Sequence, residues 1–102
     1  MTGNKESDMH YLMRVAERFG SQIVIRVRNF SKDPTARFYA EIDWIEVESE
    51  TGATLISRCG NGKTAEEALA DYRSFIEGRV LAFHAGSKCE CRDVIQSCGD
   101  ES

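Results

Sequence analysis

Two amphipathic segments with helix-start signals enclose a central stretch rich in β-branched residues, and this order restricts the fold more than any other feature. Ser7 and Thr64 suit N-cap positions, because a hydroxyl oxygen accepts a hydrogen bond from an amide of the first helical turn. A glycine follows each apolar-periodic stretch and can take the left-handed conformation that ends a helix. The pattern predicts helices over about residues 8–19 and 65–77. The side chains expected to be buried are Met9, Leu12, Met13, Ala16 and Phe19 in the first helix, and Ala68, Leu69, Tyr72, Phe75 and Ile76 in the second.

The residues between these two helices favour antiparallel strands. Residues 22–29 and 38–48 alternate apolar with polar side chains, as half-buried strands do. After Trp44, which we expect on the buried face, the apolar positions change parity, and a β-bulge at that point explains the change. Residues 54–59 complete a hairpin with the second strand, and residues 79–85 are a candidate fourth strand.

These elements predict an α+β domain with a three- or four-stranded antiparallel sheet and two helices on one face. The expected order is α-β-β-β-α, with a terminal β-strand as an option. The segment GNGKT at residues 60–64 lacks the first glycine of a phosphate-binding loop and is expected to be a strand-to-helix turn. The domain is expected to span residues 1–85. Residues 86–102 carry three cysteines and no apolar period, so we expect a flexible C-terminal tail there.

The composition excludes several classes of function. The chain has 102 residues and a net charge of −4, and residues 41–77 contain nine acidic and three basic residues. A protein that binds nucleic acid through bulk positive charge is therefore not expected. No apolar run approaches the ~20 residues of a membrane helix, and the first residues lack the pattern of a secretory signal. We expect a cytoplasmic protein that does not contact a membrane.

The sequence gives little support for catalysis or for a bound metal. His10 and His84 are the two histidines, and no nucleophile–base spacing accompanies them, so we expect a non-enzymatic protein without a cofactor. Three cysteines near the C-terminus form a C-x-C pair followed by a third after six residues. Structural zinc sites usually pair cysteines as C-x2-4-C twice. The alternative zinc site would use Cys59, Cys89, Cys91 and Cys98.

An acidic strand face is the leading candidate for binding a protein partner. Tyr39, Glu41 and Asp43 alternate with apolar residues, so they are expected to point away from the core. A tyrosine flanked by carboxylates suits an interface hot spot, and an acidic patch selects a basic partner. A solvated sheet face would show the same pattern. The candidate partner-binding residues are Tyr39, Glu41, Asp43, Glu46, Glu48 and Glu50.

The segment around the second helix carries three resemblances to known families. RCGNGKTAEEALADY resembles the end of a double-stranded-RNA-binding domain, whose fold has the same α-β-β-β-α order. The lysine-rich helix start of that family is represented here by Lys63 alone, and Glu66 and Glu67 follow it. GKTAEEALADYRSFIEG is similar to the helix of HicB-type antitoxins. It also resembles short accessory proteins of phages and mobile elements, of the anti-CRISPR type.

We therefore expect a small binding protein, in the form that the last resemblance implies: a phage-type inhibitor of a CRISPR–Cas effector. Its partner would be a host protein complex, blocked by steric occlusion or by carboxylates that mimic DNA phosphates, without direct binding of nucleic acid. One alternative is a double-stranded-RNA-binding-like or other nucleic-acid-binding module. Another is a HicB-like antitoxin, for which a homodimer is an option. The residues that the nucleic-acid alternative would use are Arg14, Arg18, Arg26, Arg28 and Lys63.

Overall fold

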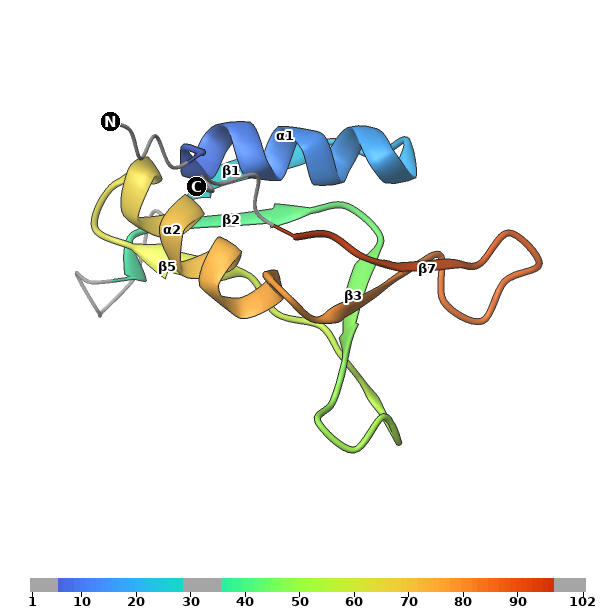
Figure 1. The fold of residues 1–102 in the computed structure, drawn as a ribbon. Helices are drawn as coiled ribbons and strands as arrows, with labels where there is room; N and C mark the ends of the chain where they lie inside the picture. Colours follow the sequence, from blue (N-terminus) through green and yellow to red (C-terminus); the bar gives the residue numbers. More distant parts are fainter. Residues whose placement is uncertain (1–5, 29–35, 97–102) are drawn as a thin grey trace.

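The computed structural model describes residues 6–28 and 36–96, where two helices and seven strands form an α+β fold (Figure 1). The α+β class predicted from the sequence is thereby confirmed. Neither helix in the described part of the chain is long and apolar enough to cross a bilayer. In chain order the elements are α1 (Asp8–Phe19), β1 (Ile23–Val27), β2 (Phe38–Ile42), β3 (Ile45–Glu48), β4 (Leu55–Ile56), β5 (Gly60–Gly62), α2 (Ala65–Ile76), β6 (Val80–Phe83) and β7 (Cys91–Val94).

The strands form two antiparallel sheets rather than one. The first sheet has the order β1-β2-β5, and the second has the order β4-β3-β6-β7. The single strand expected over residues 38–48 is divided, because the chain leaves the first sheet after Ile42 and enters the second at Ile45. Between them Trp44 takes the left-handed conformation, with φ 67°. This turn, and not a bulge, explains the parity change, since it resets which side chains face the core.

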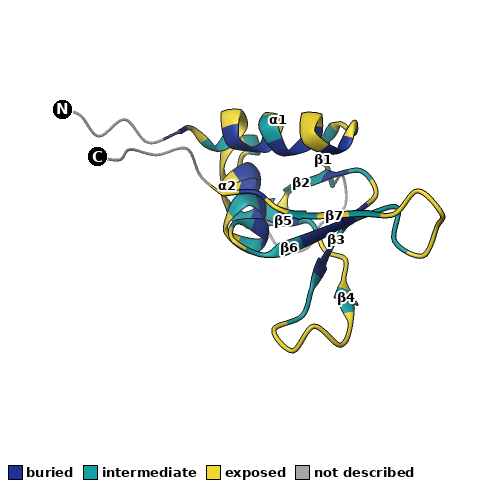
Figure 2. Ribbon diagram, turned by 45° about the vertical axis from the view of Figure 1, so that its right-hand side comes forward, coloured by how far each residue is buried: buried dark blue, intermediate teal, exposed yellow. Residues whose placement is uncertain are grey.

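Both helices and both sheets share one core. Ala40 and Ile42 of the first sheet and Val47 and Leu81 of the second are almost completely buried. Figure 2 shows the buried sides of α1 and α2 turned toward the strands, whereas the loop that joins β3 and β4 projects away from the core and is exposed. The predicted pairing of this hairpin is confirmed, but β4 is limited to Leu55–Ile56.

Helix α1 begins and ends where the sequence predicted, but its buried face is rotated. The Ser7 hydroxyl accepts a hydrogen bond from the His10 amide, and Gly20 ends the helix with φ 70°. Met9 and Met13 were expected in the core and are exposed. The side chains that α1 buries are Tyr11, Leu12, Val15, Ala16 and Phe19. Tyr11 can be fully buried in this core because its hydroxyl donates a hydrogen bond to the Ile95 carbonyl oxygen at 2.6 Å.

Helix α2 lies directly on β5, and this contact requires glycine. A Cβ added at Gly60 would lie 2.3 Å from the Ala68 carbonyl oxygen, and one at Gly62 would lie 2.4 Å from Glu67 Cβ. The GNGKT segment therefore contributes a strand beneath the helix, where a turn had been expected. The predicted Thr64 cap is confirmed, because its hydroxyl accepts a hydrogen bond from the Glu67 amide at 3.1 Å.

The C-terminal part of the described chain belongs to the core. The candidate strand within residues 79–85 is confirmed as β6. The flexible C-terminal tail expected over residues 86–102 is wrong for Cys91–Val94, which form β7 and pair with β6 along its whole length. Ile95, directly after β7, is buried against the helices and sheets. Strand β7 was missed because an edge strand with one buried apolar residue after it has too weak a period to detect.

Candidate protein-binding site

Trp44 and His84 form an exposed aromatic pair at the junction of the two sheets. The Trp44 side chain is 67% exposed, so the prediction that it belongs to the core is wrong. Its ring stacks on the His84 ring with centroids 4.8 Å apart and planes inclined by 23°. The His84 amide donates a hydrogen bond to the Trp44 carbonyl oxygen at 3.1 Å, which holds the two turns together. We call this pair the aromatic ridge.

Both residues of the aromatic ridge have positive φ, at 67° for Trp44 and 52° for His84. In the part of the chain that the structure describes, they are the two non-glycine residues with this property. The left-handed conformation costs an L-residue about 1–2 kcal/mol because Cβ approaches the following carbonyl oxygen. Such strain concentrates at functional sites, where the surrounding structure enforces it.

A hollow of about 550 Å³ lies beside the aromatic ridge. Trp44 and His84 form part of its wall, together with the carboxylate-bearing residues Glu41 and Glu46 and the hydroxyl of Ser57. A second hollow of about 310 Å³, next to the turn between α1 and β1, is also bordered by the ridge. Trp44 therefore borders two concave surfaces, so a partner that fits either of them lies next to this residue.

The carboxylates around the hollow are available for a partner. Among the described residues, neither Glu41 nor Glu46 has a hydrogen-bond or ion-pair partner, and both are half-buried. Asp43 accepts a hydrogen bond from the Gln22 side-chain amide at 3.0 Å. Burial raises the pKa of Tyr72, beneath this site, to about 12, and the charges of Glu41 and Asp43 add to the rise. The site is therefore a region of negative potential with an aromatic centre.

The structure brings together only some of the acidic residues predicted to bind a partner. Glu41, Asp43 and Glu46 line the hollow beside the aromatic ridge. Glu48 instead forms an ion pair with Arg92, and Glu50 lies in the exposed loop after β3. The Tyr39 ring lies under the Arg28 guanidinium, 4.4 Å from its carbon to the ring centroid. The one sequence signal of the aromatic ridge was the change in apolar alternation after Trp44. No sequence pattern marked His84 as part of it.

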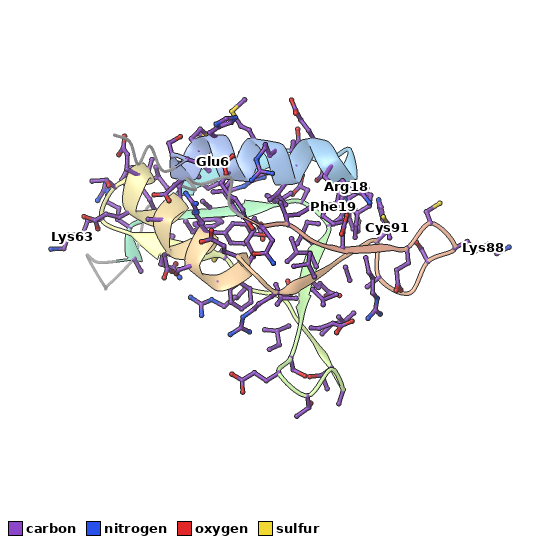
Figure 3. The ribbon with its side chains drawn as sticks, in the orientation of Figure 1. Glu6, Arg18, Phe19, Lys63, Lys88 and Cys91 are labelled. Atoms are coloured by element: carbon purple, nitrogen blue, oxygen red, sulfur yellow. The ribbon has the colours of Figure 1, made fainter. Side chains whose placement is uncertain are left out.

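The basic residues proposed for nucleic-acid binding do not form one surface. Arg14 binds Glu6, and Arg18 forms an ion pair with Asp93 at 2.8 Å. Arg28 donates a hydrogen bond to the Ala36 carbonyl oxygen and covers Tyr39, and Arg26 is exposed on the edge strand β1. In Figure 3, Lys63 lies at one end of the molecule, and Arg18 lies far from it, beside Phe19 at the C-terminal end of α1.

The proposed zinc ligands do not converge in the described part of the chain, which contains no group of three or more residues suited to hold a metal. The Cys59 sulfur lies 3.5 Å from an Arg28 nitrogen, Cys89 is exposed in the loop before β7, and Cys91 begins β7. Cys98 lies outside the described residues. His10 lies at the start of α1, with its ring nitrogen 3.7 Å from a Glu6 carboxylate oxygen.

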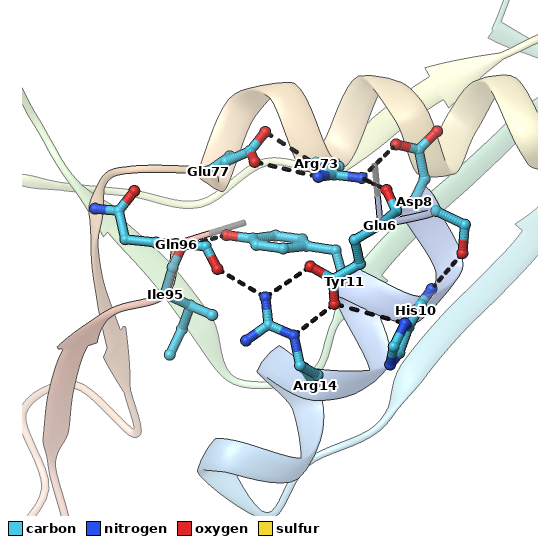
Figure 4. A network of polar contacts seen from close by, with 10 residues as sticks. Glu6, Asp8, His10, Tyr11, Arg14, Arg73, Glu77, Ile95 and Gln96 are labelled. Atoms are coloured by element: carbon cyan, nitrogen blue, oxygen red, sulfur yellow. Dashed lines mark hydrogen bonds and ion pairs between the residues drawn. The ribbon is translucent and has the colours of Figure 1, made fainter. Parts of the chain in front are cut away.

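A second polar cluster, which we call the polar clasp, joins both ends of the described chain to the helices (Figure 4). The buried Glu6 carboxylate accepts a hydrogen bond from Arg14 at 2.7 Å, and Arg14 also donates to the Gln96 carbonyl oxygen at 2.7 Å. Arg73 of α2 donates to the Glu6 carbonyl oxygen at 2.7 Å and to the Asp8 carboxylate at 3.1 Å. Because these groups satisfy one another, we assign the clasp a structural role.

Comparison of the chain with protein-family models, with curated proteins and with solved structures gives no match. The resemblances to double-stranded-RNA-binding domains, HicB-type antitoxins and anti-CRISPR-type proteins therefore stay predictions. The geometry of the aromatic ridge and its carboxylates carries the functional inference.

Proposed function

We propose that this chain is a non-enzymatic binding protein that covers a basic surface of a protein partner with its aromatic ridge. The observation that supports the proposal is Trp44, a large aromatic residue that is exposed on a strained turn and lines a hollow together with Glu41, Asp43 and Glu46. Burial of an exposed tryptophan supplies much of the affinity of protein interfaces. Surrounding charges select the partner and speed its approach.

The partner that fits such a site carries positive charge, as the nucleic-acid-binding surfaces of proteins do. In the specific form we propose, the chain is a phage-type inhibitor that blocks a CRISPR–Cas effector complex by occupying the groove that would hold nucleic acid. Glu41, Asp43 and Glu46 then stand in for phosphates. A nucleic-acid-binding function has weaker support, since Arg14, Arg18 and Arg28 are engaged within the chain.

Paired charge reversals test this proposal. Purified effector complexes are mixed with the chain, and cleavage of target nucleic acid and complex formation are measured. The unmodified chain should form a complex and inhibit cleavage, whereas the double variant Glu41→Lys and Asp43→Lys should lose both effects, because like charges meet across the interface. Folding is checked by circular dichroism and should change little, since neither Glu41 nor Asp43 is fully buried or forms an ion pair with a described residue.

The control is the double variant Arg26→Glu and Arg28→Glu, on the first strand. If the chain blocks a basic groove, this variant should inhibit as well as the unmodified chain. If the chain binds nucleic acid, the control should lose binding to a labelled RNA duplex and the acidic reversal should strengthen it. That second pattern would replace our proposal with the nucleic-acid-binding alternative.

A further inference from the structure

We infer that the hollow beside Trp44 receives the guanidinium group of an arginine side chain of the partner. The inference rests on the proposed function and names the chemical group that the site recognises. It follows from the exposed indole, from two carboxylates that pair with no described residue, and from the arginine side chains that lie over other aromatic rings of this chain.

The Trp44 indole offers a flat surface to a planar cation. His84 stacks on the ring at 4.8 Å, yet 67% of the side chain is still exposed, so ring surface is left open for a ligand. A cation over an indole face is attracted by the negative charge of the π-system, and tryptophan gives the strongest such attraction. Guanidinium stacks well on such a face because it is planar and weakly hydrated.

Arginine over an aromatic ring is a repeated arrangement on this chain. The Arg28 carbon lies 4.4 Å from the Tyr39 centroid, and the Arg58 carbon lies 4.7 Å from the Phe75 centroid. Within the described residues, no arginine or lysine lies over Trp44, although its ring is the most exposed of the large apolar side chains. No described residue therefore occupies the position that a guanidinium would take on Trp44, and a second molecule can supply one.

The carboxylates supply the second half of the recognition. Glu41 and Glu46 line the same hollow as Trp44, and no described residue pairs with either of them. A guanidinium carries five N–H donors in a fixed plane, so one that stacks on the indole can donate to carboxylates at its edge. An ammonium group of lysine is a compact and strongly hydrated charge that cannot use the ring face in the same way. The volume of about 550 Å³ has room for the side chain.

Trp44 is the single tryptophan of the chain, so tryptophan fluorescence, excited at a wavelength that tyrosine does not absorb, reports on this site alone. The probes are three synthetic peptides of equal length in which glycine alternates with arginine, with lysine or with citrulline. The arginine peptide should change Trp44 fluorescence in a saturable manner. The lysine peptide should bind roughly 3- to 30-fold more weakly, as the strength of a cation–π contact implies. The citrulline peptide keeps the planar shape without the charge and should have no effect.

Charge-neutral variants test the role of the carboxylates. Glu46→Gln and Glu41→Gln should each weaken the arginine peptide several-fold. Glu17→Gln, an exposed acid on α1, is the matched control and should bind it as the unmodified chain does. Two results would overturn the arginine assignment without contradicting the proposed function. One is equal affinity for the arginine and lysine peptides, and the other is unchanged affinity in both the Glu41→Gln and Glu46→Gln variants. If no peptide alters the fluorescence and the Glu41→Lys, Asp43→Lys variant still inhibits the effector, both inferences fail.

Discussion

Replacing Trp44 by glycine should leave a more stable protein than replacing it by alanine, which reverses the usual order of these two substitutions. Both variants lose the indole and its contact with His84. They differ in the backbone, because Trp44 has a φ of 67°. Glycine adopts this conformation freely, whereas alanine keeps the clash between Cβ and the following carbonyl oxygen.

The size of each effect follows from the structure. The Trp44 side chain is 67% exposed, so about one third of it is buried. That third is roughly 70 Å² of the 150–250 Å² of an aromatic side chain, and its loss costs about 2 kcal/mol in either variant. Alanine retains about 1–2 kcal/mol of backbone strain, and the greater freedom of unfolded glycine offsets about 0.4–1 kcal/mol of that difference. The free energy of unfolding of Trp44→Gly should therefore exceed that of Trp44→Ala by roughly 1 kcal/mol.

Urea unfolding followed by circular dichroism measures this difference, since neither variant retains a tryptophan to observe by fluorescence. The control pair is Ser57→Gly and Ser57→Ala, at an exposed position without positive φ, where glycine should be the less stable by about 0.4–1 kcal/mol. An alanine variant as stable as the glycine variant at position 44 would refute the strained turn. It would also remove backbone strain at Trp44 as support for the proposed binding site.

Three further predictions concern the core. Gly60→Ala should prevent stable folding or shift α2 off its sheet, because the added Cβ would lie 2.3 Å from the Ala68 carbonyl oxygen; thermal unfolding by circular dichroism tests this. Ile95→Ala should lower the free energy of unfolding by about 2–5 kcal/mol in urea titrations, whereas a flexible tail would make the change silent. Burial raises the pKa values of Tyr11 and Tyr72 to about 12, above the unfolded value of 10. The free energy of unfolding should therefore keep its full value below pH 10, and it should fall as the pH rises from 10 toward 12, because the unfolded chain ionises first. The loss should reach roughly 3 kcal/mol per tyrosine, and urea midpoints that stay constant over this interval would contradict it.

The helices could be predicted from the sequence because their signals are local. The Ser7 and Thr64 hydroxyls each accept a hydrogen bond from an amide three residues further along the chain, so the residue types alone reveal the caps. The division of the strands into two sheets could not be predicted. It depends on the left-handed conformation of Trp44, and tryptophan gives no signal for a conformation that glycine usually adopts.

The candidate site was predicted in part for the same reason. Alternation along the strand placed Glu41 and Asp43 away from the core, and both do line the site. The same alternation wrongly placed Trp44 in the core, because a period of two holds only while the strand continues. His84 could not be found from its sequence neighbours, since its role depends on a hydrogen bond to Trp44 that spans 40 positions.

The hydrogen bond between Tyr11 and Ile95, which lies beside the polar clasp (Figure 4), has a consequence for folding during synthesis. Tyr11 and Ile95, which meet through a buried hydrogen bond, are 84 positions apart in the chain. A ribosome that adds roughly 5–20 residues per second needs about 4–17 s to travel between them. During that time the apolar side of α1 has no complete core to pack against and stays exposed to solvent and to other proteins. Ribosome-bound chains that end at residue 85 should therefore be cut readily by protease, whereas the released full-length chain should resist cleavage.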